Sequence, residues 1–220
     1  FYASSGDSWP GQGGRRKRQK MAIYTSKTRI DLEDVGYSNK ITNKAILKIL
    51  ENAGARQSET IHFGLNDMEN VGFSWILLGW KVKILKRPIY NEELTINTWG
   101  RDSNRIFTYR DYEIYDESGE LCTIATSKWA IVDINTGRLR ELTPEIIEKY
   151  QCETKKVFKE DYTLKLKEPT TIIRKQEYKA QRRDIDINKH IHNLYYLDYA
   201  YEVLPEEVYE APECNNIEIM

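Results

Sequence analysis

The side chains best suited to chemistry are concentrated in one short stretch, residues 182–193. Within ten residues it contains two Asp, two Asn and two of the three His of the chain. Alternate residues of an extended backbone point to the same side, so Asp186, Asn188 and His190 would converge if this stretch stays extended. A carboxylate, an amide and an imidazole together can position a carbonyl or a water and move a proton. The stretch therefore predicts a catalytic loop, although a polar loop in which Asn193 merely caps the next helix explains it equally well.

A metal site is a weaker interpretation of the same residues. His190 and His192 are two positions apart and flanked by carboxylates, but no third ligand stands nearby. The three cysteines, Cys122, Cys152 and Cys214, are odd in number and show no CxxC spacing. This pattern argues against a zinc knuckle or a disulfide framework and favours reduced thiols in the cytoplasm. We therefore expect no metal and no cofactor.

The charge of the chain is unevenly distributed. Residues 1–20 carry five basic side chains and one acid, whereas residues 21–220 carry 28 basic and 33 acidic side chains. The basic stretch is not followed by an apolar segment, so it is not a secretory signal, and no run of about 18 apolar residues could span a membrane. We expect a disordered tail before Met21 and neither a membrane nor a nucleic-acid partner, since nucleic-acid binding would rest on this tail alone.

One helix and a run of antiparallel strands are expected between residues 21 and 150. Apolar residues recur at helical spacing over 43–53, and Gly54 stands where a C-cap belongs. A short helix at 144–150 begins with Pro144 behind Thr143. Strands are predicted at 23–32, 73–85, 94–98, 107–115 and 121–134. This order indicates an α+β domain in which an antiparallel sheet wraps around a central helix.

The same order then begins again. Residues 151–170 mix lysines with acids and predict a linker, after which come a strand at 171–181, a helix at 193–204 and a strand from 215. A helix with one apolar face needs a sheet to cover it, and too few residues remain to build one. The sequence thus predicts a complete unit at 21–150 and an incomplete second unit at 171–220, in a protein that continues past Met220.

A family resemblance rests on the run Asp184-Ile-Asp-Ile-Asn-Lys-His-Ile-His-Asn-Leu-Tyr-Tyr196. It closely resembles the motif of the acyl-[acyl-carrier-protein] thioesterases, roughly D-x-D-x-N-x-H-V-N-N-x-x-Y. The likeness, to the bacterial branch, continues through Pro205 and covers the helix at 43–53, Trp75-Ile-Leu, Arg87-Pro88 and residues 94–99. It implies two hot-dog domains and a cytoplasmic hydrolase that releases fatty acids from acyl carrier protein in fatty acid biosynthesis.

The resemblance also implies roles for the loop residues. Asn188 and His190 correspond to the catalytic Asn and His, which hold the thioester while an activated water attacks it. Asp186 corresponds to the acid that holds their loop. His192 replaces an Asn of the family, so the role of that position stays open. The family's further catalytic acid would lie beyond Met220, so residues 1–220 alone are expected to be inactive.

Substrate contacts are expected at two places. In the family the acyl chain lies in the N-terminal domain, where Trp75, Ile49 and Leu50 are expected to bind it, unless they are ordinary core. The basic run that includes Arg182 and Arg183 is expected to contact the acidic carrier protein, unless it is a solvated surface. An acyl-CoA thioesterase and a non-catalytic acyl-binding module remain alternatives, and the sequence leaves a homodimer open.

Overall fold

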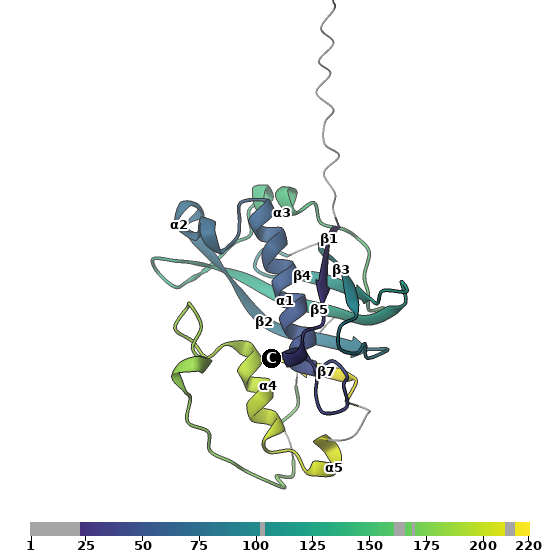
Figure 1. Cartoon of the computed structure of the whole chain (residues 1–220). Coiled ribbons are helices and arrows are strands. Elements are labelled where there is room, and N and C mark those ends of the chain that lie inside the picture. The colour runs from purple at the N-terminus through teal and green to yellow at the C-terminus, as the bar shows by residue number, and fades with distance from the viewer. Residues whose placement is uncertain (1–22, 102–103, 161–165, 169, 210–213) are drawn as a thin grey trace, which may run out of the picture.

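One antiparallel sheet and a long helix form the body of the chain (Figure 1). The computed structural model describes residues 23–101, 104–160, 166–168, 170–209 and 214–220. The strands are β1 (Tyr24–Arg29), β2 (Phe73–Ile84), β3 (Glu93–Gly100), β4 (Thr108–Tyr115), β5 (Leu121–Asp133), β6 (Leu139–Arg140) and β7 (Asn216–Ile219). The α-helices are α1 (Asn43–Thr60), α2 (Met68–Val71), α3 (Pro144–Tyr150), α4 (Asn193–Tyr201) and α5 (Glu206–Tyr209). The tail predicted at residues 1–20 lies outside the described residues.

The sheet wraps around α1, as the strand and helix pattern predicts. Its strand order is β1-β3-β4-β5-β2-β7, and β6 pairs with β5. The buried face of α1 carries Ile46, Leu47 and Leu50, and the sheet supplies large side chains such as Trp80 and Tyr112 to the same core. Burying each of these apolar side chains contributes about 1.5–3 kcal/mol, so this contact is the main reason that the helix and the sheet fold together.

The predicted end of the helix at Gly54 is wrong, because α1 continues to Thr60. A Cβ at Gly54 would lie 2.9 Å from the Tyr112 hydroxyl and 3.2 Å from Cδ of Arg110. The glycine therefore allows β4 to approach the helix closely and does not cap it. Gly in a helix interior costs about 1 kcal/mol relative to Ala, which is why a sequence reading favours a helix end at this position.

Some of the other predicted strands and helices are confirmed, and others are wrong. The strands at β2 and β5 and the helix α3, with its Thr143 cap, are confirmed. The strand predicted at 171–181 is wrong, because these residues are exposed on all sides and pair with none of the described strands. Without a buried face or a partner strand, an extended run gains nothing that offsets its loss of chain entropy. Helix α4 ends at Tyr201 and not at residue 204.

The loops that lead into α1 and α4 have the same fold, with equivalent residues 150 positions apart. In the first loop Thr42 N–H donates to the Asp34 carbonyl at 2.9 Å, and in the second His192 N–H donates to the Asp184 carbonyl at 2.8 Å. A short 3₁₀ turn, η1 (Leu32–Asp34) or η3 (Arg182–Asp184), precedes each loop. The expected structural repeat is therefore visible in hydrogen bonds, although the two loops share few residue types.

Residues 214–220 join the sheet of the first unit. Strand β7 pairs antiparallel with β2. Its residue Ile217 is buried in the same core as the apolar residues of α1 and α4. Arg87 donates to the carbonyls of Ile41 and Cys214 and to the side chain of Asn43, at 2.9, 3.0 and 2.7 Å. One guanidinium thus links the start of α1 to the chain just before β7. Figure 1 shows α4 near the lower end of α1.

Candidate active site

The loop with the candidate catalytic residues is a compact turn, so the assumption that it stays extended is wrong. The Asp186 carboxylate accepts the N–H groups of Asn188 and His190, at 2.8 and 3.1 Å. The Asp186 N–H donates to the His190 carbonyl at 2.8 Å, and Lys189 adopts a left-handed φ of 62°. Asp186 therefore fixes the backbone of the turn, and Asn188 and His190 lie at the tip and at the end of it.

A buried carboxylate fastens this turn to helix α4. Asp184 is fully buried and accepts hydrogen bonds from the Gln181 N–H at 2.6 Å and the Tyr199 hydroxyl at 2.7 Å. Burial alone would raise the pKa of Asp184, but these hydrogen bonds outweigh it and hold the pKa below its ordinary value. Asp184 is therefore ionised at neutral pH and holds the start of the loop against α4.

The N-terminus of α4 meets the middle of α1. His192, and not Asn193, is the N-cap, and its Nδ1 accepts the Leu194 N–H at 3.3 Å. The Asn193 side chain donates to the Glu51 carboxylate at 3.4 Å, and His192 Nε2 lies 3.8 Å from the same carboxylate. Burial raises the pKa of Glu51, and the nearby His192 opposes that shift. The loop is thus connected to an acid on α1.

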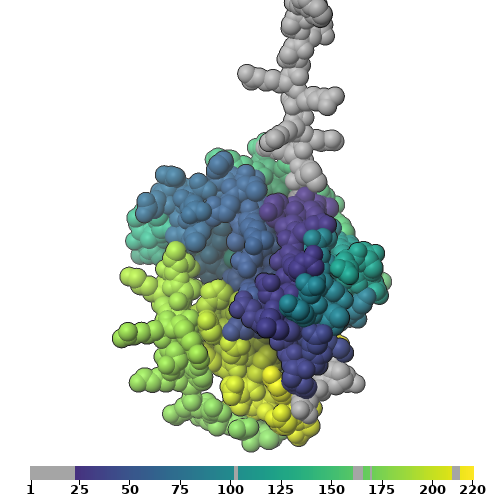
Figure 2. Space-filling view, viewed as in Figure 1, coloured from purple at the N-terminus to yellow at the C-terminus, as the bar shows by residue number. Residues whose placement is uncertain are grey.

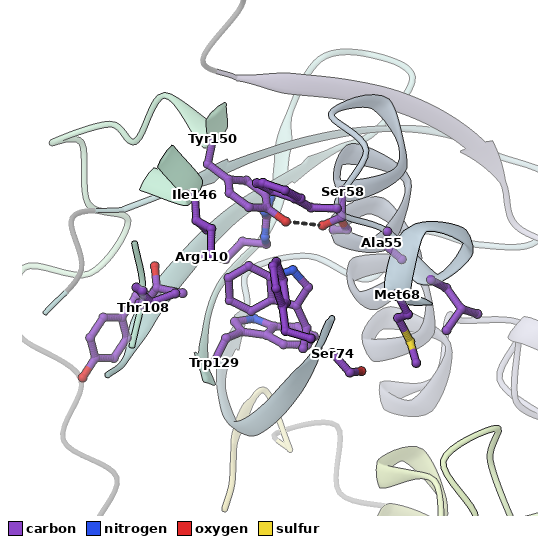
Figure 3. A pocket seen from close by; sticks show the side chains of 18 of the residues that line it. Ala55, Ser58, Met68, Ser74, Thr108, Arg110, Trp129, Ile146 and Tyr150 are labelled. Carbon is purple, nitrogen blue, oxygen red and sulfur yellow. Dashed lines mark hydrogen bonds between the residues drawn. The ribbon is translucent and has the colours of Figure 1, made fainter. Parts of the chain in front are cut away.

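An apolar cavity of about 240 Å³ opens beside this contact. Asn188 lines it from the loop, and Glu51, Ala55 and Ser58 line it along one face of α1. Figure 3 shows its walls, which come from α1, α2, α3, β2, β4 and β5. Most of the wall is aromatic or aliphatic, and its large side chains include Phe63, Phe73, Trp75, Trp129, Ile146 and Tyr150. Such a cavity suits a hydrocarbon chain.

A few polar groups interrupt the apolar wall. The Ser58 and Tyr150 hydroxyls are 2.7 Å apart, as the dashed line in Figure 3 marks. Burial raises the pKa of Tyr150, so its hydroxyl stays protonated. The buried guanidinium of Arg110 bonds to Gln57 and, at 3.2 Å, to Thr98. These groups are satisfied by one another, so they fix the shape of the wall and still leave most of it apolar.

The structure places the remaining predicted site residues in different surroundings. Trp75 lines the same cavity as Asn188. Ile49 and Leu50 lie instead in the core between α1 and the sheet and are absent from the cavity lining. Arg182, Arg183 and His190 are exposed, and Arg183 Nε lies 3.7 Å from the Asp184 carboxylate. Among the described residues, no cluster of His, Cys, Asp or Glu could hold a metal ion.

Sequence reasoning missed Glu51 and the small residues that follow it on α1. The predicted helix ended at Gly54, so Ala55 and Ser58 were not recognised as part of its face. Their spacing from Glu51, four and seven positions, is the spacing that places side chains on one helix face. A longer helix would have put an acid on the same face as these residues, but the sequence does not show what covers that face.

The wrapped helix, the repeated helix-loop unit and the apolar cavity define a protein of the hot-dog fold. Residues 21–150 match the family described as acyl-ACP thioesterase N-terminal domain, and residues 167–220 match its C-terminal domain. The chain therefore belongs to the acyl-ACP thioesterase family.

Similar proteins agree with this assignment. The oleoyl-acyl carrier protein thioesterase 1, chloroplastic, of Arabidopsis thaliana is 25% identical over 206 residues, which are 86% of this chain and 57% of that protein. An acyl-ACP thioesterase structure from Bacteroides thetaiotaomicron has a TM-score of 0.77 at 22% identity and covers 90% of this chain and 79% of its own. The 12:0-ACP thioesterase from Umbellularia californica has a TM-score of 0.72 at 19% identity, with 87% and 78% covered. The chain thus spans little more than half the length of the Arabidopsis relative, and the two structures show its fold.

Proposed function

We propose that this protein hydrolyses the thioester of acyl-acyl carrier protein and releases a free fatty acid in fatty acid biosynthesis. The observation that carries the proposal is the position of Asn188, at the wall of an apolar cavity that suits an acyl chain. The family membership supports the same reaction. No cofactor is needed, because a thioester carbonyl needs only a polarising group, a water and a proton acceptor.

Each residue of the turn has a role in this proposal. The amide of Asn188 binds the thioester at the cavity wall, and His190, two residues later, assists from the exposed end of the turn. Asp186 acts indirectly, because its carboxylate accepts the backbone N–H groups of both residues. Trp75 contacts the acyl chain inside the cavity.

The experiment is turnover of an acyl-carrier substrate by the protein at its natural length. Asn188→Ala and His190→Ala should each lower kcat by about 10²- to 10³-fold, since one lost polarising donor costs about that much. Ile187→Ala is the matched control, because Ile187 is an exposed neighbour in the same turn and should leave kcat unchanged. Turnover that is equally fast in the Asn188, His190 and Ile187 variants would sink the proposal.

The carrier protein is the proposed partner, in place of CoA. Arg174, Lys175, Lys179, Arg182 and Arg183 precede the catalytic turn, with Glu177 the one acid among them, and all are exposed. A basic surface of this kind suits an acidic partner protein. Hydrolysis of one acyl group presented on CoA and on carrier protein tests the choice. An acyl-binding module without catalysis would instead bind the fatty acyl group and release no thiol from either.

The organisation and location of the protein are part of the proposal. Residues 21–150 form the acyl-binding unit, residues 151–170 link it to the next, and residues 171–220 carry the catalytic turn. Among the described residues no helix is long and apolar enough to cross a membrane. Cys122, Cys152 and Cys214 form no disulfide in the part of the chain that the structure describes, which suits a reducing compartment such as the cytoplasm.

A further inference from the structure

Two equivalent contacts join α1 to α4. Asn43 and Asn193 are the first residues of the two helices, and Glu51 and Tyr201 are the equivalent residues eight positions later. The Asn43 side chain donates to the Tyr201 hydroxyl at 2.6 Å, and the Asn193 side chain donates to the Glu51 carboxylate at 3.4 Å. Each contact therefore joins the start of one helix to a residue further along the other.

The second contact contains ionisable groups that the first lacks. Thr42 and His192 are the equivalent N-cap residues, and the side chain of each accepts a backbone N–H of its own helix. The Thr42 hydroxyl has no charge, and burial raises the pKa of Tyr201, so its hydroxyl is neutral as well. In contrast, His192 Nε2 lies 3.8 Å from the Glu51 carboxylate. The neutral contact shows that packing of the helices at this position needs no ion pair.

The ionisable contact lies at the cavity, beside the turn of the proposed site. Glu51 and Asn188 both line the cavity, and His192 follows Asn188 by four residues. The other ion pair between the two helices joins Lys44 to Asp198, and neither of these residues lines the cavity. A shift of His192 relative to Glu51 would therefore move Asn188 along the cavity wall, whereas a change at Lys44 would not.

Partial burial makes the Glu51 carboxylate dependent on its partners. Its side chain is 25% exposed, and burial raises its pKa, while the charge of His192 opposes that shift. A carboxylate that has lost water is stable only with an opposite charge or with hydrogen bonds. Protonated His192 supplies the charge, and Asn193 supplies a hydrogen bond. Both come from the start of α4, so ionised Glu51 attracts this end of the helix to the cavity.

We propose that Glu51 and His192 form an ion pair that positions the turn of Asn188 against the cavity; this inference rests on the proposed function. Glu51 acts through His192 and not on the thioester, so both are positioning residues. Loss of either charge leaves the helices joined through Asn193 but lets the turn shift. A misplacement of about 1 Å can lower a rate about 10²-fold, so a small shift of the Asn188 amide is enough to reduce kcat.

The groups that face Glu51 determine how the pair responds to pH. His192 of α4 and Asp186 of the turn act on its charge. From β4, the pKa of Tyr112 responds to Glu51, and Arg110 lines the same cavity. Because its pKa is raised, Glu51 takes up a proton at a higher pH than an ordinary glutamate. A protonated carboxyl and a Gln amide are both neutral and similar in shape, so the effect of Glu51→Gln on kcat should shrink as the pH falls through this raised pKa.

The test is a double-mutant cycle on acyl-carrier substrate, in the protein at its natural length. His192→Asn keeps a strong N-cap residue but removes the charge opposite Glu51. Glu51→Gln removes the other charge and keeps an acceptor for Asn193. Each should lower kcat by about 3- to 30-fold, within the range for coupled neighbours, and leave KM within a few-fold. The double variant should lose no more than the worse single variant, because the pair is already broken.

Asp198→Asn is the matched control. It removes the other ion pair between α1 and α4, away from the cavity, so kcat and its pH dependence should stay unchanged. Losses that multiply in the double variant, or an equal loss in Asp198→Asn, would overturn the positioning role and leave the proposed function standing. An effect of Glu51→Gln that is the same at every pH would do so too.

Hydrogen exchange gives a readout that does not depend on turnover. The amides of residues 184–194 should exchange faster in Glu51→Gln and His192→Asn than in the unaltered protein, while the amides of the sheet should exchange at the same rate in all of them. Unchanged exchange in both variants would overturn the positioning role alone. Absence of turnover in the unaltered protein would overturn the proposed function and this inference together.

Discussion

Met68 gives the cavity its most adaptable wall. It begins α2, is half-buried, and lines the cavity opposite the aromatic side chains of the sheet (Figure 3). Methionine has three rotatable bonds and no polar hydrogen, so it changes shape without breaking a hydrogen bond. Its replacement should therefore alter the volume of the cavity more than the stability of the fold.

The residue scale thus carries a prediction on acyl chain length. Met68→Trp should shorten the preferred acyl chain and Met68→Ala should lengthen it. Each methylene of the acyl chain that the cavity newly accepts or excludes changes the relative kcat/KM by about 10- to 200-fold. The measurement is kcat/KM over a series of acyl-carrier substrates. Met68→Leu, which keeps the volume, is the control, and one preferred length in all three variants would mean that the cavity does not hold the chain.

At the scale of elements, a hydrogen bond from Tyr199 of α4 to Asp184 links the proposed catalytic turn to that helix. The Tyr199 hydroxyl helps to hold the pKa of Asp184 below the value it has in an unfolded chain. A group with a depressed pKa stabilises the fold at pH above its unfolded pKa, about 3.9, and loses this effect as the pH falls through the lower folded pKa. The turn should therefore stay attached to α4 until strongly acidic pH.

Removing that hydroxyl tests the attachment. Tyr199→Phe deprives Asp184 of one donor, so its pKa rises and the turn should loosen at a higher pH than in the unaltered protein. Hydrogen exchange of the amides of residues 184–194, followed from neutral to acidic pH, measures this. Tyr196→Phe is the control, because Tyr196 is exposed on the same helix and has no bond to Asp184. Identical exchange in both variants would contradict the role of the hydroxyl.

The sequence predicts those elements whose signals are local. Helix α3 follows from Thr143 and Pro144, and β2 and β5 follow from long runs of apolar and β-branched residues. The predicted helix end at Gly54 is wrong because this glycine makes room for β4, which is more than 50 residues away in sequence. The predicted strand at 171–181 is wrong because a strand needs a second segment to pair with, and the sequence of one segment does not show whether that partner is present.

The site shows the same division. Asn188, His190 and Asp186 are recognisable because their types and spacing are dense within one turn. Their backbone arrangement is not, since Asp186 folds the turn through its own carboxylate. The contact of Glu51 with His192 and Asn193 escapes notice because α1 and α4 meet only in the folded chain. Local chemistry is therefore readable in the sequence, whereas the contacts between distant helices are not.

At the scale of the whole molecule, the basic surface of residues 174–183 lies next to the proposed catalytic turn. Residues 170–183 run along one side of the molecule and lead into the turn, and Figure 2 shows this segment in light green with side chains that extend from the surface. The body of the chain at 21–220 is acidic on balance, so this local excess of positive charge stands out against it. A negatively charged carrier protein would be attracted to this side, which brings its acyl group to the cavity.

Replacing Arg182 and Arg183 by alanine should therefore weaken docking and leave the chemistry intact. Exposed ion pairs contribute about 0.2–1 kcal/mol each, so KM for acyl-carrier substrate should rise roughly 2- to 30-fold, while kcat stays unchanged. The rise should shrink at high salt, where the unaltered protein also docks weakly.

Small thioesters, which have no protein surface to dock, should be hydrolysed at the same rate by both forms. Lys27→Ala with Arg29→Ala removes two positive charges from β1, at the other edge of the sheet from β7, and is the matched control. An equal loss on small thioesters and carrier substrate would show that Arg182 and Arg183 support the turn itself and do not bind the partner.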